Sequence, residues 1–194
     1  MRPLFLGPAD SPLIPWLRER EGHVGQTAAP VHGASPVLAD HDFLVSYGYR
    51  HILRPDVLAR FDERAVNLHI SYLPWNRGAD PNLWSFLDDT PKGVTIHYLD
   101  AGVDTGDVIV QRHVEPSPDD TLATSYSRLT EAIEALFREW WPRIRDGRCP
   151  RTPQGGPGTA HRAADKQRFA HLLTGGWDTP VAAVRGAAQR PTAT

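Results

Sequence analysis

The pattern of apolar residues predicts strands that alternate with helices along the chain. Short apolar runs bounded by turn residues indicate buried strands, and they occupy residues 3–6, 43–46, 66–70, 94–99 and 108–114. A further short strand is expected within residues 22–31. Strands that alternate with helical segments are typical of a mainly parallel sheet. The pattern therefore predicts a single α/β domain with a mostly parallel sheet flanked by helices.

Turn and capping residues predict where the shorter helices begin. Asp10 or Ser11 can cap a helix that runs to about residue 21. Pro55 at a first helical position predicts a helix to about residue 61. Asp80 as cap, followed by Pro81, predicts a helix over residues 82–87. The strand, turn and helix at the N-terminus suggest a Rossmann-like start. The chain has no G-x-G-x-x-G motif, so a dinucleotide is not supported.

A long helix is expected after Asp119 or Asp120, either of which can cap it. Apolar residues recur there at steps of three and four, as one buried helix face requires: Leu122, Tyr126, Leu129, Ile133, Leu136, Phe137 and Trp140. Pro142 is expected to end or kink this helix. Residues 146–160 read as a loop or hairpin, and a small helix is expected over 161–173. We expect the catalytic domain to span 1–185 and a flexible tail to span 186–194.

Composition and charge exclude several classes of protein. The chain of 194 residues is 40% hydrophobic and has a net charge of −2, whereas a nucleic-acid-binding protein usually has a basic face or tail. A single cysteine, Cys149, excludes an internal disulfide and a cysteine-cluster zinc site. No apolar run reaches the roughly 18 residues of a membrane helix, and the N-terminus lacks a signal sequence. We expect a cytoplasmic enzyme without nucleic-acid, membrane or metal partners.

One strand and one loop together carry the candidate chemistry. Asn67 and His69 are two positions apart on the strand at 66–70, so their side chains point to the same side. Asp104 lies in a glycine-flanked loop after the next strand and can face them. An amide, an imidazole and a carboxylate around one opening suit acyl transfer, because they can stabilise an oxyanion and move a proton.

The residues alone leave other interpretations open. A single histidine beside apolar residues is usually a core residue with its hydrogen bonds satisfied. Asp104 precedes Thr-Gly and could serve only as an Asx turn. Asp100 and Asp107 lie in the same loop region, so chemistry alone does not decide which carboxylate belongs to the site.

The motifs N-x-H at Asn67, L-P-x-x-R-G at Leu73 and D-x-G at Asp104, in this order, resemble the formyltransferase family that uses 10-formyltetrahydrofolate. The run SYLPWNRGADPNLWSF is closest to the sugar N-formyltransferases and to the formylation domain of nonribosomal peptide synthetases. Only 66 residues precede Asn67, fewer than in longer members, and the synthetase domains are similarly short. The resemblance thus implies a shortened Rossmann-like sheet. It also argues against a tRNA acceptor, since the chain has no room for a separate C-terminal barrel.

The resemblance also implies roles for individual residues. Asn67, His69 and Asp104 are implied to be catalytic. Residues implied to bind the folate, partly through backbone groups, are His51, Ile52, Leu53, His97, Asp100, Ala101, Gly102 and Val103. Residues implied to bind the acceptor are Trp75, Asn76, Arg77 and Gly78.

We therefore expect an N-formyltransferase that moves a formyl group from 10-formyltetrahydrofolate to a primary amine of a small metabolite. A nucleotide-linked amino sugar is the first choice of acceptor. An aminoacyl group on a carrier protein, or another amine in secondary metabolism, is the second. A formyltetrahydrofolate hydrolase and a non-catalytic folate-binding module are the remaining alternatives. A homodimer is a further expectation.

Overall fold

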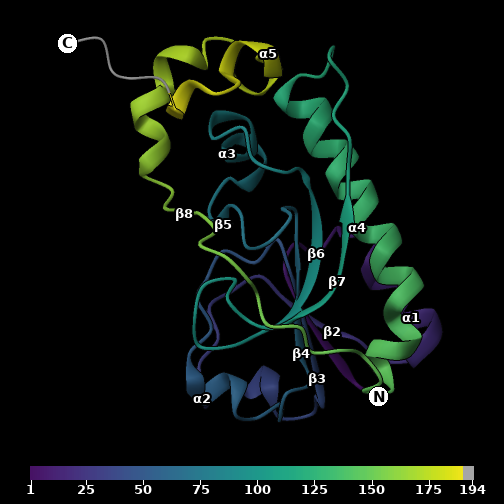
Figure 1. The fold of residues 1–194 in the computed structure, drawn as a ribbon. Coiled ribbons are helices and arrows are strands. Elements are labelled where there is room, and N and C mark those ends of the chain that lie inside the picture. Colours follow the sequence, from purple (N-terminus) through teal and green to yellow (C-terminus); the bar gives the residue numbers. More distant parts are fainter. Residues whose placement is uncertain (190–194) are drawn as a thin grey trace. The chain divides into compact units, whose positions relative to one another are not determined.

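A computed structural model of the chain describes residues 1–189 (Figure 1). The strands are β1 (Pro3–Leu6), β2 (Gly25–Thr27), β3 (Phe43–Tyr47), β4 (Ala65–His69), β5 (Arg77–Gly78), β6 (Gly93–Tyr98), β7 (Val108–His113) and β8 (Ala160–His161). The α-helices are α1 (Leu13–Glu21), α2 (Pro55–Leu58), α3 (Pro81–Leu87), α4 (Leu122–Arg145) and α5 (Val181–Val184). Four 3₁₀ helices complete the described part: η1 (Pro36–Leu38), η2 (Asp165–Leu172), η3 (Gly176–Asp178) and η4 (Ala187–Gln189).

Six strands form one sheet in the order β2-β1-β3-β4-β6-β7. The pairings of β1 with β2, of β1 with β3 and of β3 with β4 are parallel. The register sets Ser46 of β3 beside Asn67 of β4. The α/β class with a mostly parallel sheet is confirmed, and each strand expected from the apolar runs is present within two residues of its predicted ends.

Strand β6 runs in the opposite direction to the strands on either side of it, β4 and β7. The bond from Leu99 N to Ala65 O, at 2.9 Å, sets the end of β6 beside the start of β4. The bond from Tyr98 N to Asp107 O, also 2.9 Å, joins the end of β6 to the start of β7. Consequently β6 runs against both of its neighbours. This antiparallel register brings His97 opposite Asn67, although 30 residues separate them.

Contacts between residues divide the described chain into two compact units. Among the described residues, the first holds 1–69, 96–110 and 136–154, and the second holds 70–95, 111–135 and 155–189. Strands β6 and β7 and helix α4 each contribute residues to both units.

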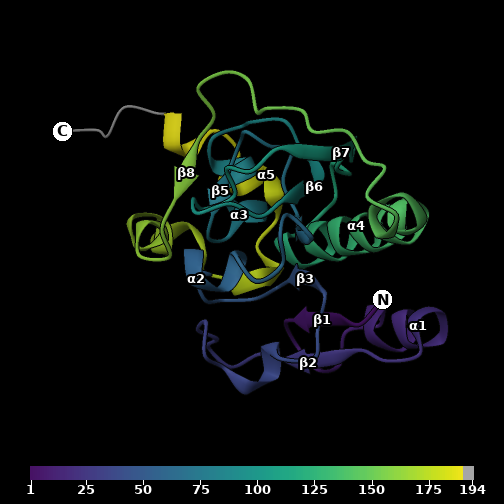
Figure 2. The same ribbon diagram turned by 90° about the horizontal axis from the view of Figure 1, so that it is seen from below.

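Both faces of the sheet are covered in the first unit. Leu44 packs in a buried cluster with Val57 of α2 and with Phe61. Its neighbour Phe43 points to the opposite face and meets Trp141 of α4, with ring centroids 5.4 Å apart. Helix α1 lies beside β1 and β2, as Figures 1 and 2 both show. The alternation of apolar side chains along β3 thus accounts for helices on two faces.

The apolar stripe of α4 differs from the prediction at Tyr126, which is 48% exposed, and at its C-terminal end. Trp141 is buried, whereas Trp140, which the stripe included, is half-buried. Pro142 lies inside the helix, which continues to Arg145, so of the two expected effects the end of the helix does not occur and the kink stays a prediction. Trp141 also donates from Nε1 to Glu21 Oε1 at 2.9 Å, and this bond ties α4 to the end of α1.

The start of α4 is capped by a residue that sequence inspection missed. Thr124 N donates to Thr121 Oγ1 at 3.2 Å, and Thr121 N donates to Thr124 Oγ1 at 2.9 Å. This reciprocal pair is a capping box. Asp120, which was one of the two expected caps, is buried, and its Oδ1 accepts hydrogen bonds from Thr124 Oγ1 and from Arg128. The cap therefore lies one residue later than predicted.

The second unit has its own apolar core, made by Leu83, Trp84, Phe86, Leu87, Leu122, Phe169, Val181 and Val184. Helix α3 starts at Pro81 with Asp80 at the cap position, as predicted. The Asp80 side chain makes no cap hydrogen bond, because the residue has φ of 51°, and its carboxylate pairs with Lys166 at 2.9 Å.

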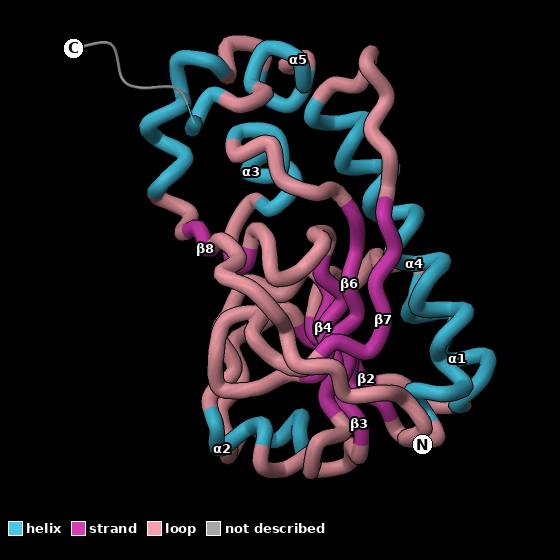
Figure 3. Tube along the Cα trace, viewed as in Figure 1, coloured by secondary structure: helices cyan, strands magenta, loops and turns pink. Residues whose placement is uncertain are grey.

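Much of the chain after α4 is loop, as Figure 3 shows and as the sequence predicted for 146–160. The small helix expected over 161–173 is the 3₁₀ helix η2. Residues 187–189 form η4, and residues 190–194 of the expected tail lie outside the described residues. The boundary at 185 stays a prediction.

Candidate active site

Strand β4 presents Asn67 and His69 on one side and buries Leu68 on the other. His69 is buried at the end of the strand, and Asn67 is half-buried. The sequence produces this arrangement because the flanking apolar residues fix the strand in the middle of the sheet. Both polar side chains are therefore held on a rigid element.

The Asn67 amide bridges two side chains of the antiparallel neighbour and its loop. Its Nδ2 donates to Asp104 Oδ1 at 3.1 Å and lies 3.2 Å from His97 Nε2. A carboxylate only accepts hydrogen bonds, so the amide nitrogen, and not its oxygen, must face Asp104. Both N–H bonds of the amide then point at partners, and the carbonyl Oδ1 is turned away from the carboxylate.

The ring of His97 is set in one tautomer by its backbone contact. Its Nδ1 lies 2.7 Å from the carbonyl oxygen of Tyr98, which can only accept, so Nδ1 carries a hydrogen. In the neutral ring Nε2 then has a lone pair and accepts from Asn67. His97 is 1% exposed. The resemblance implied that it lines the folate pocket, whereas its ring directly contacts Asn67 and the Asp104 carboxylate.

Asp104 lies between the two imidazoles. Its Oδ2 is 3.7 Å from His69 Nδ1, and its Oδ1 is 3.5 Å from His97 Nε2. The two rings are nearly perpendicular, at 82°, with centroids 6.4 Å apart. With Nδ1 of His69 toward Asp104, its Nε2 edge is directed away from the carboxylate.

The loop geometry separates the three candidate carboxylates. Asp100 accepts from Gly102 N at 3.0 Å and from Thr105 Oγ1 at 2.8 Å, so it builds the loop from within. Asp107 faces Arg151 at 3.9 Å. Asp104 contacts both imidazoles, and it adopts φ of 53°, in the left-handed region. The Asx-turn geometry thus belongs to Asp100.

Gln154 contacts this loop and had no signal in the sequence. Its Nε2 donates to the carbonyl oxygens of Asp104, at 2.8 Å, and of Gly106, at 2.9 Å. It lies 50 residues after Asp104, in a segment that reads only as loop. Thr152, two residues earlier, pairs with Val108 of β7, and this bridge brings Gln154 to the loop.

The positions implied to bind folate include two exposed apolar side chains in the first unit. Ile52 is 72% exposed and Val103 is 47% exposed. The ring of His51 lies against Tyr49, at 5.1 Å between centroids. Leu53 is buried in the core, so only its backbone groups are available to a ligand. These side chains fit a flat, partly apolar ligand that is also bound by backbone groups.

The positions implied to bind the acceptor belong to the second unit. Asn76 is 0% exposed, and its Nδ2 donates to Thr90 Oγ1 at 2.8 Å while its Oδ1 accepts from Thr159 Oγ1 at 3.2 Å. Its side chain therefore holds the loop. Trp75, Arg77 and Gly78 are half-buried, and the last two form β5.

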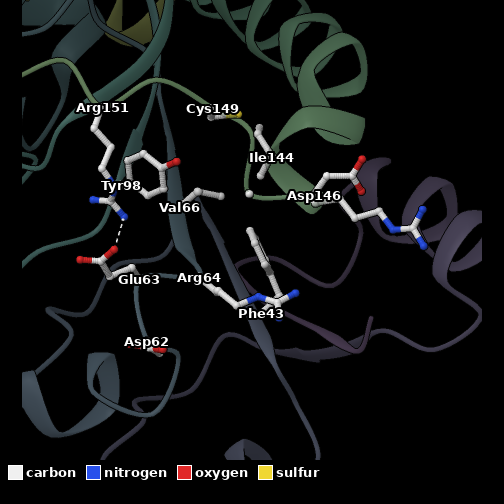
Figure 4. Close-up of a pocket in the computed structure, with 12 residues that line it drawn as sticks. Phe43, Asp62, Glu63, Arg64, Val66, Tyr98, Ile144, Asp146, Cys149 and Arg151 are labelled. Carbon is white, nitrogen blue, oxygen red and sulfur yellow. Dashed lines mark hydrogen bonds and ion pairs between the residues drawn. The ribbon is translucent and has the colours of Figure 1, made fainter.

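Figure 4 shows a cavity of about 370 Å³ in the first unit, whose lining residues do not include Asn67, His97 or Asp104. Val66 and Tyr98 line it, and they are the strand neighbours of Asn67 and His97, so they face the opposite side of the sheet. Burial raises the pKa of Tyr98 and that of Cys149, which lines the same cavity. A raised thiol pKa is typical of an inert cysteine. The cavity is not the site of Asn67, His97 and Asp104.

The described residues hold no candidate metal site and no candidate membrane span. Among residues 1–189, no group of three or more histidine, cysteine, aspartate or glutamate side chains could hold a metal ion. No helix within the same residues is long and apolar enough to cross a membrane.

Comparison with known proteins identifies close relatives of this chain. The sequence profile of the family described as Formyl transferase matches residues 35–139. The formyltransferase PseJ from Anoxybacillus kamchatkensis, solved with UDP-4,6-dideoxy-4-formamido-L-AltNAc and tetrahydrofolate, is 53% identical, with a TM-score of 0.95 over 97% of this chain and 100% of that chain.

More distant structures share the fold. A 4-N formyltransferase from Francisella tularensis is 18% identical, with a TM-score of 0.75 over 87% of this chain and 78% of that chain. The methionyl-tRNA formyltransferase from Clostridium thermocellum is 16% identical, with a TM-score of 0.64 over 84% of this chain and 72% of that chain.

Proposed function

Because this chain belongs to the formyl transferase family, we propose that it moves a formyl group from 10-formyltetrahydrofolate to the primary amine of a nucleotide-linked amino sugar. The relative that is 53% identical over nearly the whole chain was solved with tetrahydrofolate and a nucleotide-linked formamido sugar. The observation that carries the proposal is the cluster of Asn67, His69, His97 and Asp104 at the end of β4. Its groups match the needs of formyl transfer.

Formyl transfer to an amine makes and breaks one carbon–nitrogen bond. The neutral amine attacks the formyl carbon, and the formyl oxygen gains negative charge. The attacking nitrogen then loses a proton, the bond to N10 of the folate breaks, and N10 gains a proton. The products are a formamide and tetrahydrofolate. The protein must therefore stabilise an oxyanion and move one proton.

His69 is the proposed donor to the oxyanion. The Asp104 carboxylate lies 3.7 Å from Nδ1, so Nε2 is the ring nitrogen that can donate to the oxyanion. A hydrogen-bond donor aimed at a developing oxyanion is worth roughly 10²–10³ in rate. When the amine releases its proton, Asp104 is also proposed to accept that proton, directly or through water.

Asn67 is proposed to act on the attacking amine and the formyl group. Its Nδ2 is held by Asp104 and His97, which fixes the amide plane and directs Oδ1 away from them. In this state Oδ1 can accept from the amine N–H and orient its lone pair. Donation from Nδ2 to the formyl oxygen requires exchange of one of these two bonds. His97 is proposed to support the amide and not to react.

The folate is proposed to lie against the segments that follow β3 and β6. His51, Ile52 and Leu53 supply backbone groups and one exposed apolar side chain, and the loop of Asp100, Ala101, Gly102 and Val103 supplies another. A pterin is flat and has several hydrogen-bond donors and acceptors, so it suits backbone groups between apolar walls.

The acceptor is proposed to bind the segment of Trp75, Arg77 and Gly78, whose conformation Asn76 maintains. An arginine can pair with the phosphates of a nucleotide. An aminoacyl group on a carrier protein is the second candidate acceptor, because the sequence around these residues also resembles that branch. Location in the cytoplasm, where folates are available, and a homodimeric state are also proposed.

Incubation of the pure protein with 10-formyltetrahydrofolate and a panel of amines tests the proposal. The panel contains nucleotide-linked 3- and 4-amino sugars and aminoacyl carrier proteins. Release of tetrahydrofolate that requires an amino sugar, with a formyl group found on that sugar by mass spectrometry, is the expected result. Release that requires the carrier protein would replace the acceptor assignment. Release without any amine would identify a hydrolase, and folate binding without release would identify a binding module.

A further inference from the structure

We propose that residues 154–161, which follow the region matched by the family profile, hold positioning residues for two separate parts of the reaction. Gln154 positions the loop of Asp104. Thr159 and His161 position the segment 74–78. This inference rests on the proposed function, since it assigns the first contact to catalysis and the second to acceptor binding.

The contact of Gln154 fixes the backbone on both sides of Thr105. One amide nitrogen donates to the carbonyl oxygens of Asp104 and Gly106, so the side chain closes the tight turn between them. Asp104 has φ of 53°, in the left-handed region, which residues other than glycine adopt less readily. The two hydrogen bonds from Gln154 hold the loop in this conformation. Gln154 therefore aims the carboxylate without touching substrate.

The contact of Thr159 lies in the second unit and involves other groups. Its Oγ1 accepts from Asn76 N at 2.8 Å and donates to Asn76 Oδ1 at 3.2 Å. The backbone continues this contact, since Arg77 N donates to Thr159 O at 2.9 Å and Ala79 N donates to His161 O at 2.9 Å. The backbone N–H and the side-chain oxygen of Asn76, and the backbone N–H of Arg77, are thus all hydrogen-bonded to Thr159.

Two glycines allow this close approach. Gly158, with φ of 59°, lies so near that a side chain there would overlap the carbonyl oxygen of Pro74. Gly78, with φ of 87°, would overlap the carbonyl oxygen of His161 in the same way. At Gly158 and at Gly78 the two backbone segments pack directly against each other, so the conformation of residues 74–78 is restricted where they contact residues 158–161.

His161 anchors the segment to the core of the second unit. Its ring stacks on Trp84, with centroids 3.7 Å apart and 2° between planes, and its Nε2 lies 2.8 Å from Asp88 Oδ2. Trp84 is buried and meets Phe169 edge-on at 5.6 Å. The position of β8, and through it that of Arg77, therefore depends on packed aromatic residues.

Separate effects on two kinetic constants test this inference. Gln154→Glu removes both donors, and we expect kcat to fall by about tenfold or more while the KM for the acceptor changes by less than about threefold. Thr159→Val removes the hydroxyl but keeps the shape, and we expect the acceptor KM to rise by about fivefold or more with kcat within about twofold. Thr159→Ser should restore the acceptor KM. His161→Phe keeps the stacked ring and should show a smaller rise.

Matched changes on exposed residues serve as controls. Gln167→Glu and Thr174→Val make the same chemical substitutions on η2 and just beyond it, and both should retain the constants of the unmodified protein. Gln154→Met is measured beside Gln154→Glu, because it removes the donors without adding a charge. Circular dichroism identifies any variant that is unfolded.

The outcomes separate the inference from the proposed function. Lack of transfer by the unmodified protein with every amine would overturn the proposed function itself. An active protein in which both Gln154 variants keep kcat, or Thr159→Val keeps the acceptor KM, would overturn the inference alone. Equal changes in both constants for every variant would show a merely structural role, and would also overturn it.

Discussion

Replacement of Asn67 by aspartate exchanges one NH₂ group for an oxygen atom and keeps the shape of the side chain. The exchanged atom lies 3.1 Å from Asp104 Oδ1 and 3.2 Å from His97 Nε2. Both bonds that hold the amide are lost, and two carboxylates face each other. We expect the variant to fold and to lose nearly all transfer activity.

The size of the effect follows from these distances. Two unit charges 3.1 Å apart repel by about 5 kcal/mol at an effective dielectric constant near 20, so one carboxyl takes up a proton and has a raised pKa. A raised carboxyl pKa costs stability only where the group is ionised in the unfolded chain. The melting temperature should therefore fall further below that of the unmodified protein at neutral pH than in mild acid. Loss of the oriented amide should lower kcat by roughly 10²–10³.

Single-turnover transfer and thermal melting at several pH values measure both effects. Asn67→Ala is the companion variant, because it removes the amide without adding a charge and should lower kcat without the pH-dependent loss of stability. Transfer by Asn67→Asp within about threefold of the unmodified rate would refute the role given to this amide. A difference in melting temperature that does not change with pH would refute the contact with Asp104.

Three further changes test other parts of the structure. Burial raises the pKa of Asp120, but hydrogen bonds, chiefly from Arg128, outweigh this effect and hold the pKa low. The stability that the Asp120 carboxylate contributes is therefore lost as pH falls through the carboxyl range. Asp120→Asn should lower the free energy of unfolding by about 1–3 kcal/mol near neutral pH and make the stability depend less on pH in acid, as measured by denaturant titration. Gly106→Ala places a methyl group on the carbonyl oxygen of Tyr98 and should cost about 1–3 kcal/mol and lower kcat, measured by melting and turnover. Because burial raises the pKa of Cys149, this thiol should react with a chromophoric thiol reagent more slowly than free cysteine, and Cys149→Ser should keep full turnover.

Local patterns predicted the strands because each apolar run is itself the buried part of a strand. They also predicted that Asn67 and His69 share a face, since a strand alternates with a period of two. The glycine-flanked loop suggested Asp104 and the resemblance favoured it over Asp100 and Asp107; in the structure Asp104 contacts Asn67 and both imidazoles. These features depend on residues that are close in the sequence or share a recognised motif.

Other features depend on register and on distant contacts, which no local pattern contains. His97 meets Asn67 only because β6 runs antiparallel to β4. Gln154 reaches the Asp104 loop through the bridge between Thr152 and Val108. The burial of Trp141 in place of Trp140 likewise reflects the packing of α4 against Phe43, and not the helical period alone.

The most direct test of the account is single-turnover formyl transfer by Asp104→Asn, with tetrahydrofolate binding measured on the same preparation. The carboxylate contacts Asn67, His69 and His97, so this change removes the charge on which the whole cluster depends. We predict folate binding within about threefold of the unmodified protein and a transfer rate lower by roughly 10² or more. Transfer at nearly the unmodified rate would contradict the account, because the cluster at the end of β4 would then not be the site of the reaction.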